Sequence, residues 1–188
     1  ASLELDAMGR DAAIEIRTAA PADIPHLAAV QLVSALEAFA HIFPASVSKP
    51  LAHDLEAEWA ALVDDPASTV VLAEVSGRVV AGVACGDVPA LAPEGYGLLA
   101  KLYVRPTYAG RGIGTLLYET AVAQMREAGW KRLWLWVLED NARARGMYDR
   151  RGWIAQSDRR TDWPGSGVFE MGYALDLRTT EGAGSTRP

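Results

Sequence analysis

The sequence predicts one mixed α/β domain built around a central sheet. Segments of strand composition alternate with segments whose apolar residues recur at helical spacing. Two apolar runs, 68–75 and 78–87, are joined at Ser76-Gly77, as in a β-hairpin. A third strand-like run ends at Pro106 and is followed by a glycine-rich turn and an amphipathic helix. The chain has 188 residues, half of them apolar and 22% charged, which is the composition of a globular domain.

The remaining elements are predicted from breaks in these patterns. A first strand covers 14–17, and Asp23 and Pro25 mark the start of a helix that runs to about residue 40. Pro44 and Pro50 separate this helix from a second one, which Pro50 opens. The other expected elements are the end of the second helix near 63, a loop at 88–95, a strand at 96–104, a helix at 113–128, a strand at 131–138, a helix from 141 to about 151, and strands at 153–160 and 168–177. Residues 1–12 are predicted to be an N-terminal extension, 13–177 the domain, and 178–188 a disordered tail.

Three glycines lie at alternate positions at the start of the helix at 113–128: Gly110, Gly112 and Gly114. A helix start presents unpaired N–H groups and a partial positive charge, and glycine lets an anion approach the backbone closely. We therefore expect this turn to bind a phosphorylated ligand, with a plain turn that uses glycine for tight packing as the alternative. It is neither a GxxxxGK[ST] loop, because Thr115 follows Gly114, nor a GxGxxG fingerprint, because Leu117 stands at the third glycine position.

This stretch resembles the acyl-CoA-binding motif of the GNAT superfamily of N-acetyltransferases. The matching residues are Leu102-Tyr103-Val104, Pro106, Tyr108, Gly112-Ile113-Gly114-Thr115 and Leu117, whereas Ala109 stands where the family usually has Arg or Gln. A second stretch resembles a later motif of the same family. It matches at Asn141, Ala144, Tyr148 and Gly152, with Met147 and Trp153 as apolar variants. Two motifs in the family's order are more specific than either one alone.

The resemblance implies a fold, a donor and a reaction. The fold would be the α/β GNAT fold over about 14–177: a central, mixed, mostly antiparallel seven-stranded sheet with about four helices, in which strands 4 and 5 are parallel and splayed. The donor would be acetyl-CoA, and the acceptor a primary amine of a small molecule or peptide that attacks directly in a ternary complex. The residues implied in binding acetyl-CoA are Leu102, Tyr103, Val104, Ala109, Gly110, Arg111, Gly112, Ile113, Gly114, Thr115, Asn141, Arg143, Ala144 and Tyr148.

The family also implies roles in the chemistry. Tyr148 would protonate the leaving thiolate, since a phenol can donate a proton and regain one from solvent; the alternative is a core tyrosine. Asn141 would orient pantetheine, cap its own helix, or do both. Backbone N–H groups near 102–104 would meet the oxyanion and the pantetheine amides.

No general base is identified from the sequence. Many family members carry a Glu on the fourth strand where this chain has Leu98 or Leu99. Glu94, Asp87, His41 and a chain of waters are the candidates that remain. The absent carboxylate and Ala109 motivate an alternative function, a catalytically silent acyl-CoA-binding regulatory module. A protein-interaction domain that binds no CoA is a second alternative.

Charge and composition restrict the partners. The net charge of −6 argues against nucleic acid. Residues 101–160 nevertheless hold 12 Lys or Arg against 6 Asp or Glu, which suits a polyanionic donor. Apolar runs are too short to span a bilayer and the first residues show no secretory signal, so we expect a cytoplasmic protein without a membrane partner. The single cysteine, Cys85, is expected to be buried and inert, and no His/Cys cluster predicts a metal site. The sequence is compatible with a homodimer but does not specify one.

Overall fold

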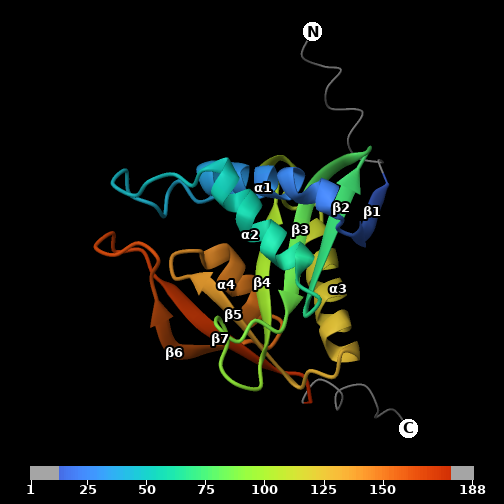
Figure 1. Cartoon of the computed structure of the whole chain (residues 1–188). Coiled ribbons are helices and arrows are strands. Elements are labelled where there is room, and N and C mark those ends of the chain that lie inside the picture. Colours follow the sequence, from blue (N-terminus) through green and yellow to red (C-terminus); the bar gives the residue numbers. More distant parts are fainter. Residues whose placement is uncertain (1–12, 179–188) are drawn as a thin grey trace.

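The computed structural model describes residues 13–178, and its centre is a seven-stranded sheet in the order β1-β2-β3-β4-β5-β7-β6 (Figure 1). The strands are β1 (Ile14–Thr18), β2 (Ser68–Val75), β3 (Arg78–Gly86), β4 (Gly97–Val104), β5 (Arg132–Leu138), β6 (Ile154–Arg160) and β7 (Glu170–Asp176). The helices are α1 (Ile24–Val33), α2 (Ala52–Asp64), α3 (Ile113–Glu127) and α4 (Ala142–Asp149), with short turns η1 (Pro21–Asp23), η2 (Ser34–Ala38) and η3 (Pro106–Tyr108). The predicted N-terminal extension lies outside the described residues, and so does the predicted tail beyond Arg178. None of the helices between residues 13 and 178 has the length and apolar character needed to cross a membrane.

The sheet is antiparallel except at one place, between β4 and β5. These strands run parallel and pair at two positions only, Gly97 with Leu133 and Leu98 with Trp134. Beyond them β4 stays paired with β3 as far as Val104, while β5 stays paired with β7 from Arg132 to Leu138. The two strands therefore diverge, which confirms the predicted mixed sheet with parallel, splayed strands 4 and 5.

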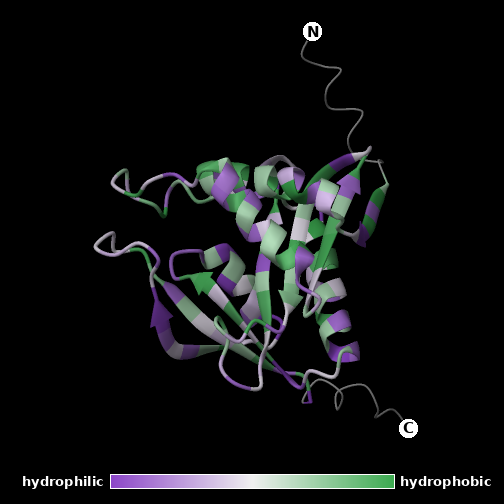
Figure 2. Ribbon diagram, viewed as in Figure 1, coloured by the Kyte–Doolittle hydropathy of each residue, from purple (hydrophilic) through white to green (hydrophobic). Residues whose placement is uncertain are grey.

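Helices cover both faces of the sheet. On one face α1 and α2 bury a core that includes Leu27, Leu55 and Trp59. On the other face α3 and α4 bury a core that includes Leu117 and Tyr148. Strand β3 is buried along nearly its whole length because both of its faces are covered. The edge strand β6 is mostly hydrophilic, as its colour in Figure 2 shows, and this protects the open edge of the sheet from pairing with another chain.

The first helix differs from its prediction. It begins as expected, with Pro25 in its first turn, but its α-helical part ends at Val33 and continues as the π-helical turn η2. The Phe39 amide donates to the Ser34 carbonyl at 3.2 Å, five residues back. The Ser34 hydroxyl lies 2.9 Å from the Val30 carbonyl and 3.1 Å from the carbonyl of Val104, at the end of β4. The wider turn thus fastens the first helix to the strand that feeds the glycine turn, and π-turns of this kind are frequent at functional sites.

Candidate active site

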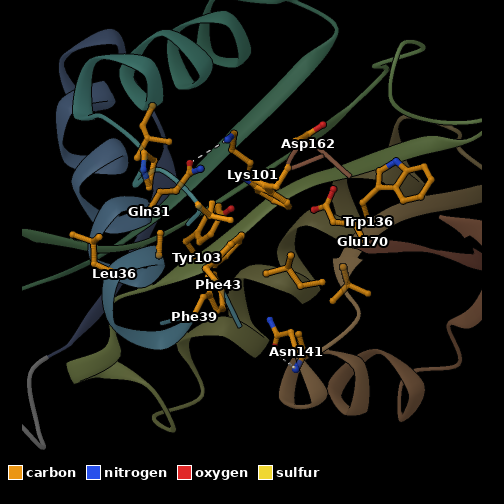
Figure 3. Close-up of a pocket in the computed structure, with 18 of the residues that line it drawn as sticks. Gln31, Leu36, Phe39, Phe43, Lys101, Tyr103, Trp136, Asn141, Asp162 and Glu170 are labelled. Carbon is orange, nitrogen blue, oxygen red and sulfur yellow. Dashed lines mark hydrogen bonds between the residues drawn. The ribbon is translucent and has the colours of Figure 1, made fainter. Parts of the chain in front are cut away.

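A cavity of about 630 Å³ opens where β4 and β5 separate (Figure 3). Its walls come from segments far apart in the chain: α1 and η2, the connection from residue 39 to 50, α2, the ends of β4 and β5, α4, and the connection between β6 and β7. The two connections project on the same side of the molecule in Figure 1 and meet where the ring of Phe43 packs edge-on against that of Trp163, with ring centroids 4.8 Å apart. The aromatic residues Phe39, Phe43 and Trp163 line this cavity, whereas Trp59 is fully buried.

The free edge of β4 presents backbone groups to the gap. The Arg105 amide donates to the Val80 carbonyl at 2.8 Å, so it points toward β3. Because N–H groups alternate in direction along a strand, the amides of Leu102 and Val104 point the other way, toward β5. Leu102 and Tyr103, two residues of the segment predicted to bind pantetheine, line the cavity.

A bulge in β4 redirects side chains toward the cavity. Lys101 pairs with Ala84 and Leu99 pairs with Cys85, so Ala100 is left without a partner on β3. The extra residue places Lys101 on the α1–α2 face. There its Nζ lies 3.1 Å from Gln31 Oε1 and 2.5 Å from a Glu58 carboxylate oxygen.

The glycine turn has the backbone shape that an anion site requires. Gly110 and Gly112 both have φ of 81°, and a Cβ at either would meet no atom within 4 Å. Conformation rather than space therefore calls for glycine at these two positions. Gly114 differs, because its Cβ would lie 3.3 Å from Val104 Cγ2. Gly114 thus lets α3 pack directly on the end of β4.

The first turn of α3 leaves several amides without helical acceptors. The Leu116 amide is the first to bond back, to the Gly112 carbonyl at 3.0 Å. The amides of Ile113, Gly114 and Thr115 precede it and are directed out of the helix start, where the partial positive charge of α3 also lies. The Ala109 amide is different: it donates to the Pro106 carbonyl at 3.0 Å, so it closes η3 and is already used.

Two arginines lie beside this turn. The Arg111 guanidinium stacks 5.1 Å above the Tyr108 ring. Arg151, which is not among the residues predicted to bind the donor, donates to Thr115 Oγ1 at 3.0 Å and to the Met147 carbonyl at 3.1 Å. Its guanidinium also lies 5.1 Å from the centre of the Tyr118 ring. The only signal for Arg151 in the sequence is its place immediately before Gly152 in the second motif.

The second motif forms α4. Asn141 Oδ1 accepts from the Ala144 amide at 3.1 Å and thereby caps the helix, while both residues line the cavity. The two roles expected for Asn141 are thus compatible in this geometry. Arg143 is exposed and is not among the residues that line the cavity.

Tyr148 is buried and also lines the cavity. Only 7% of it is exposed, and its ring packs at 5.7 to 6.3 Å from the rings of Tyr118, Trp153 and Tyr173. Its hydroxyl makes no hydrogen bond with residues 13–178. Burial is the main cause that raises its pKa. The ring is therefore part of the core, while the hydroxyl remains a protonated donor not committed to another residue.

The carboxylates of the site differ from those considered in the sequence. Leu98 and Leu99 are buried, so no carboxylate occupies that part of β4. His41, Asp87 and Glu94 are exposed and do not line the cavity. The acidic side chains that do line it are Glu58, Asp162 and Glu170. Glu170 was missed because it lies on β7, far along the chain, and reaches the site only because β7 pairs with β5. A carboxylate at the start of an otherwise apolar strand was its only signal.

Cys85 is buried, as expected for an inert thiol. Burial raises its pKa to about 11, so the thiol stays protonated and is a poor nucleophile at neutral pH. Among residues 13–178 there is also no cluster of three His, Cys, Asp or Glu side chains that could hold a metal ion.

The family model of the acetyltransferase (GNAT) family matches residues 32–153, well over half of the chain. The chain belongs to this family. The match spans the π-turn, the glycine turn and the whole of the α4 motif, so the family predicted from the two motifs is confirmed.

Relatives and solved structures agree with this assignment. An uncharacterized N-acetyltransferase of Archaeoglobus fulgidus is 35% identical over 100 residues, or 52% of this chain and 65% of the relative. A [ribosomal protein bS18]-alanine N-acetyltransferase of Haemophilus influenzae is 36% identical over 66 residues, or 35% of this chain and 44% of the relative. The chain thus spans less than two thirds of the length of either one. The structure of yncA from Salmonella typhimurium with its cofactor acetyl-CoA superposes with a TM-score of 0.67 at 19% identity, covering 88% of this chain and 94% of that one. A structure from Desulfovibrio desulfuricans described as of the GNAT family superposes with a TM-score of 0.68 at 19% identity, covering 87% of this chain and 99% of that one, and this likeness together with the family match confirms the predicted GNAT fold.

Proposed function

We propose that the protein is an acyl-CoA-dependent N-acetyltransferase that moves an acetyl group from acetyl-CoA to a primary amine of a small molecule or peptide. The observation that carries the proposal is the divergence of β4 from β5, which opens a cavity that takes in both the free backbone edge of β4 and Tyr148. A thioester laid against that edge would be close to an N–H donor and to a proton donor. The amine would attack it directly, in a ternary complex.

The residues present fit a CoA-type donor. The amides from Gly110 to Thr115 would hold the diphosphate at the start of α3, whereas the Ala109 amide is already bonded to the Pro106 carbonyl. The amides of Leu102 and Val104 would pair with pantetheine, and Asn141 and Ala144 would border it from α4. Bound acetyl-CoA supplies the activated thioester.

The chain's own groups would then manage charge and protons. An N–H on the β4 edge donates to the oxygen that becomes negative during attack. The Tyr148 hydroxyl gives its proton to the departing sulfur and regains one from solvent. No covalent enzyme intermediate is expected, because Cys85 is buried with a raised pKa.

The acceptor is proposed on chemical grounds. The bS18 relative is described as acetylating an alanine of a ribosomal protein, which supports a peptide amine as one acceptor class. Three carboxylates and six aromatic residues in the cavity wall favour a cationic amine on an apolar carrier. A cytoplasmic location and a homodimer remain predictions.

Two measurements test the proposal and its rivals. Free thiol release from acetyl-CoA is followed across a panel of benzylamine, spermidine, lysine and an alanine-initiated hexapeptide. Thermal unfolding is measured with and without CoA, since a ligand that binds only the folded state raises its stability. Turnover of at least one amine supports the enzyme. A thermal shift without turnover would favour the silent CoA-binding module, and no shift would favour an interaction domain.

A further inference from the structure

Glu170 occupies a distinctive place in the cavity. It is the first residue of β7, pairs through its backbone with Leu138 of β5, and lies in Figure 3 near Lys101 and Trp136. Along β7 it alternates with Met171 and Tyr173, which pack into the α3–α4 core, so its side chain lies on the opposite face. It therefore faces the gap from the α1–α2 side, while Tyr148 borders the gap from α4.

Within residues 13–178, one carboxylate oxygen of Glu170 accepts a hydrogen bond and the other does not. Oε2 accepts from Arg160 Nε on β6 at 2.8 Å, and the Arg160 guanidinium is fixed by stacking 4.6 Å above the Trp136 ring. Oε1 accepts no hydrogen bond from residues 13–178. The Glu170 side chain is only 16% exposed. A carboxylate oriented by an arginine, with its second oxygen open to a cavity, is arranged to accept a proton.

The other carboxylates in the cavity wall are less suited to this task. Glu58 is 52% exposed in its side chain and is neutralised by Lys101. Asp162 is exposed on the β6–β7 connection. Burial raises the pKa of Glu170, and nearby Asp162 raises it further, while Arg160 on β6 and Lys101 on β4 lower it. The burial effect is the largest, which moves the carboxyl toward the range of a working base.

We propose, on top of the proposed function, that Glu170 is the general base that deprotonates the acceptor's ammonium group. The N–H bond of the ammonium breaks, its proton goes to Oε1 of Glu170, and the electron pair stays on nitrogen. That pair forms the new N–C bond, and the C–S bond breaks; the sulfur keeps its electrons and takes the proton of Tyr148. The nitrogen releases its second proton to solvent and becomes the neutral amide, and Tyr148 regains a proton from solvent. Glu170 then returns its proton to solvent. The proposal thus places the basic carboxylate on β7, whereas many family members carry a Glu on the fourth strand.

The test uses two amines of similar size that differ in protonation. Benzylamine is an ammonium ion at neutral pH and needs a base, whereas phenylhydrazine is already neutral. In Glu170→Gln we expect kcat/KM for benzylamine to fall roughly 100-fold while the value for phenylhydrazine changes less than about threefold. In the parent, kcat/KM for benzylamine should rise with pH and level off once Glu170 is deprotonated. In Glu170→Gln it should not level off there, because no base titrates at that position. The rise in unfolding temperature that CoA produces should be the same in this variant as in the parent.

Two further variants separate catalysis from structure. Glu74→Gln removes a comparably buried carboxylate, 18% exposed in its side chain and paired with Arg17 away from the cavity, and should leave both amines unaffected. Arg160→Gln breaks the same ion pair as Glu170→Gln but keeps the carboxylate; activity should remain, with the acidic limb moved to higher pH. Equal losses for Arg160→Gln and Glu170→Gln, or equal losses for the two amines, would overturn the assignment. Absence of turnover by the unaltered chain would sink the proposed function itself, and this inference with it.

Discussion

The proposed donor end and the proposed acceptor end of the site are built from different groups. At the donor end the groups expected to bind CoA are backbone amides, supplied by the glycine turn at 110–115, which lies outside the cavity wall, and by the edge of β4. At the acceptor end the groups are side chains, brought together from α1, α2, β4 and β7. A backbone site depends on φ and ψ and tolerates most changes of side chain nearby. A side-chain site can change its specificity by substitution without disturbing the fold. The difference explains how one architecture can keep its donor and vary its acceptor.

The largest expected effect is at the donor end, in Gly112→Asp. A residue with a Cβ is strained at φ of 81°, and the new carboxylate would repel the diphosphate. CoA affinity should fall at least about 100-fold, about 2.7 kcal/mol, by calorimetric titration. Gly77→Asp is the matched control, because Gly77 has φ of 72° and equally open surroundings in the β2–β3 turn. It should lose similar stability and bind CoA normally; equal binding by both variants would show that the turn is not the phosphate site.

The next effect lies at the boundary between the two ends, in Tyr148→Phe. We expect kcat to fall about 100-fold with CoA affinity unchanged, because only the proton donor is removed. Since the pKa of Tyr148 is raised, its phenol should stay protonated at neutral and mildly alkaline pH, and kcat should not decline there through its ionisation. If Tyr148→Phe keeps the parental kcat at every pH, the thiolate is protonated by another group.

Tyr118→Phe is the control for Tyr148. Its hydroxyl accepts from Trp153 Nε1 at 2.8 Å within the same aromatic cluster and does not line the cavity. Removing it should cost about 1–3 kcal/mol of unfolding free energy, measured by urea denaturation, since it leaves a buried N–H unpaired. Its kcat should be unchanged.

A smaller effect is expected at the acceptor end, in Ser34→Ala. The hydroxyl that joins η2 to the Val104 carbonyl is lost, so the wall formed by η2 should loosen. We expect KM for benzylamine to rise severalfold, KM for acetyl-CoA to stay constant, and the stability to fall by about 1 kcal/mol. Thr120→Ala removes a similar helical hydroxyl contact, 2.9 Å from the Leu116 carbonyl on α3, and should alter neither KM. A rise in both KM values would mean that the two ends are not independent.

The smallest effect concerns Arg151→Gln. Loss of its hydrogen bond to Thr115 should loosen the link between α4 and the glycine turn and weaken CoA binding about threefold, under 1 kcal/mol. Arg150→Gln removes the same charge from the exposed neighbouring position and should bind like the parent in the same titration. If both variants lose affinity alike, the effect is one of general charge and not of the contact with Thr115.

The sequence predicted the features that depend on local backbone conformation better than those that depend on side chains from distant segments. Gly110 and Gly112 report a backbone conformation directly, because few other residues adopt it, so a local pattern was enough to locate the turn. The apolar periodicity of α3 and the alternation of the strands likewise depend on near neighbours.

The features that were missed depend on contacts between distant segments. The π-turn at Ser34 forms against Val104, 70 residues away, and nothing in residues 34–38 alone distinguishes it from α-helix. Glu170 faces the site only because β7 lies between β5 and β6 in the sheet. Arg151 meets Thr115 through the packing of α4 beside α3.

The short junction between β4 and β5 affects the shape of the cleft. It joins two halves of the sheet, β1-β2-β3-β4 and β5-β7-β6, through a seam at which Gly97 and Leu98 pair with Leu133 and Trp134. Behind this seam Gly97 is wedged so tightly that a Cβ would lie 2.2 Å from Met125 Cε and 2.8 Å from the Trp130 ring. Because the two halves of the sheet pair at these positions, the width of the cleft is set at its narrow end by this junction and at its outer rim by the contact between Phe43 and Trp163.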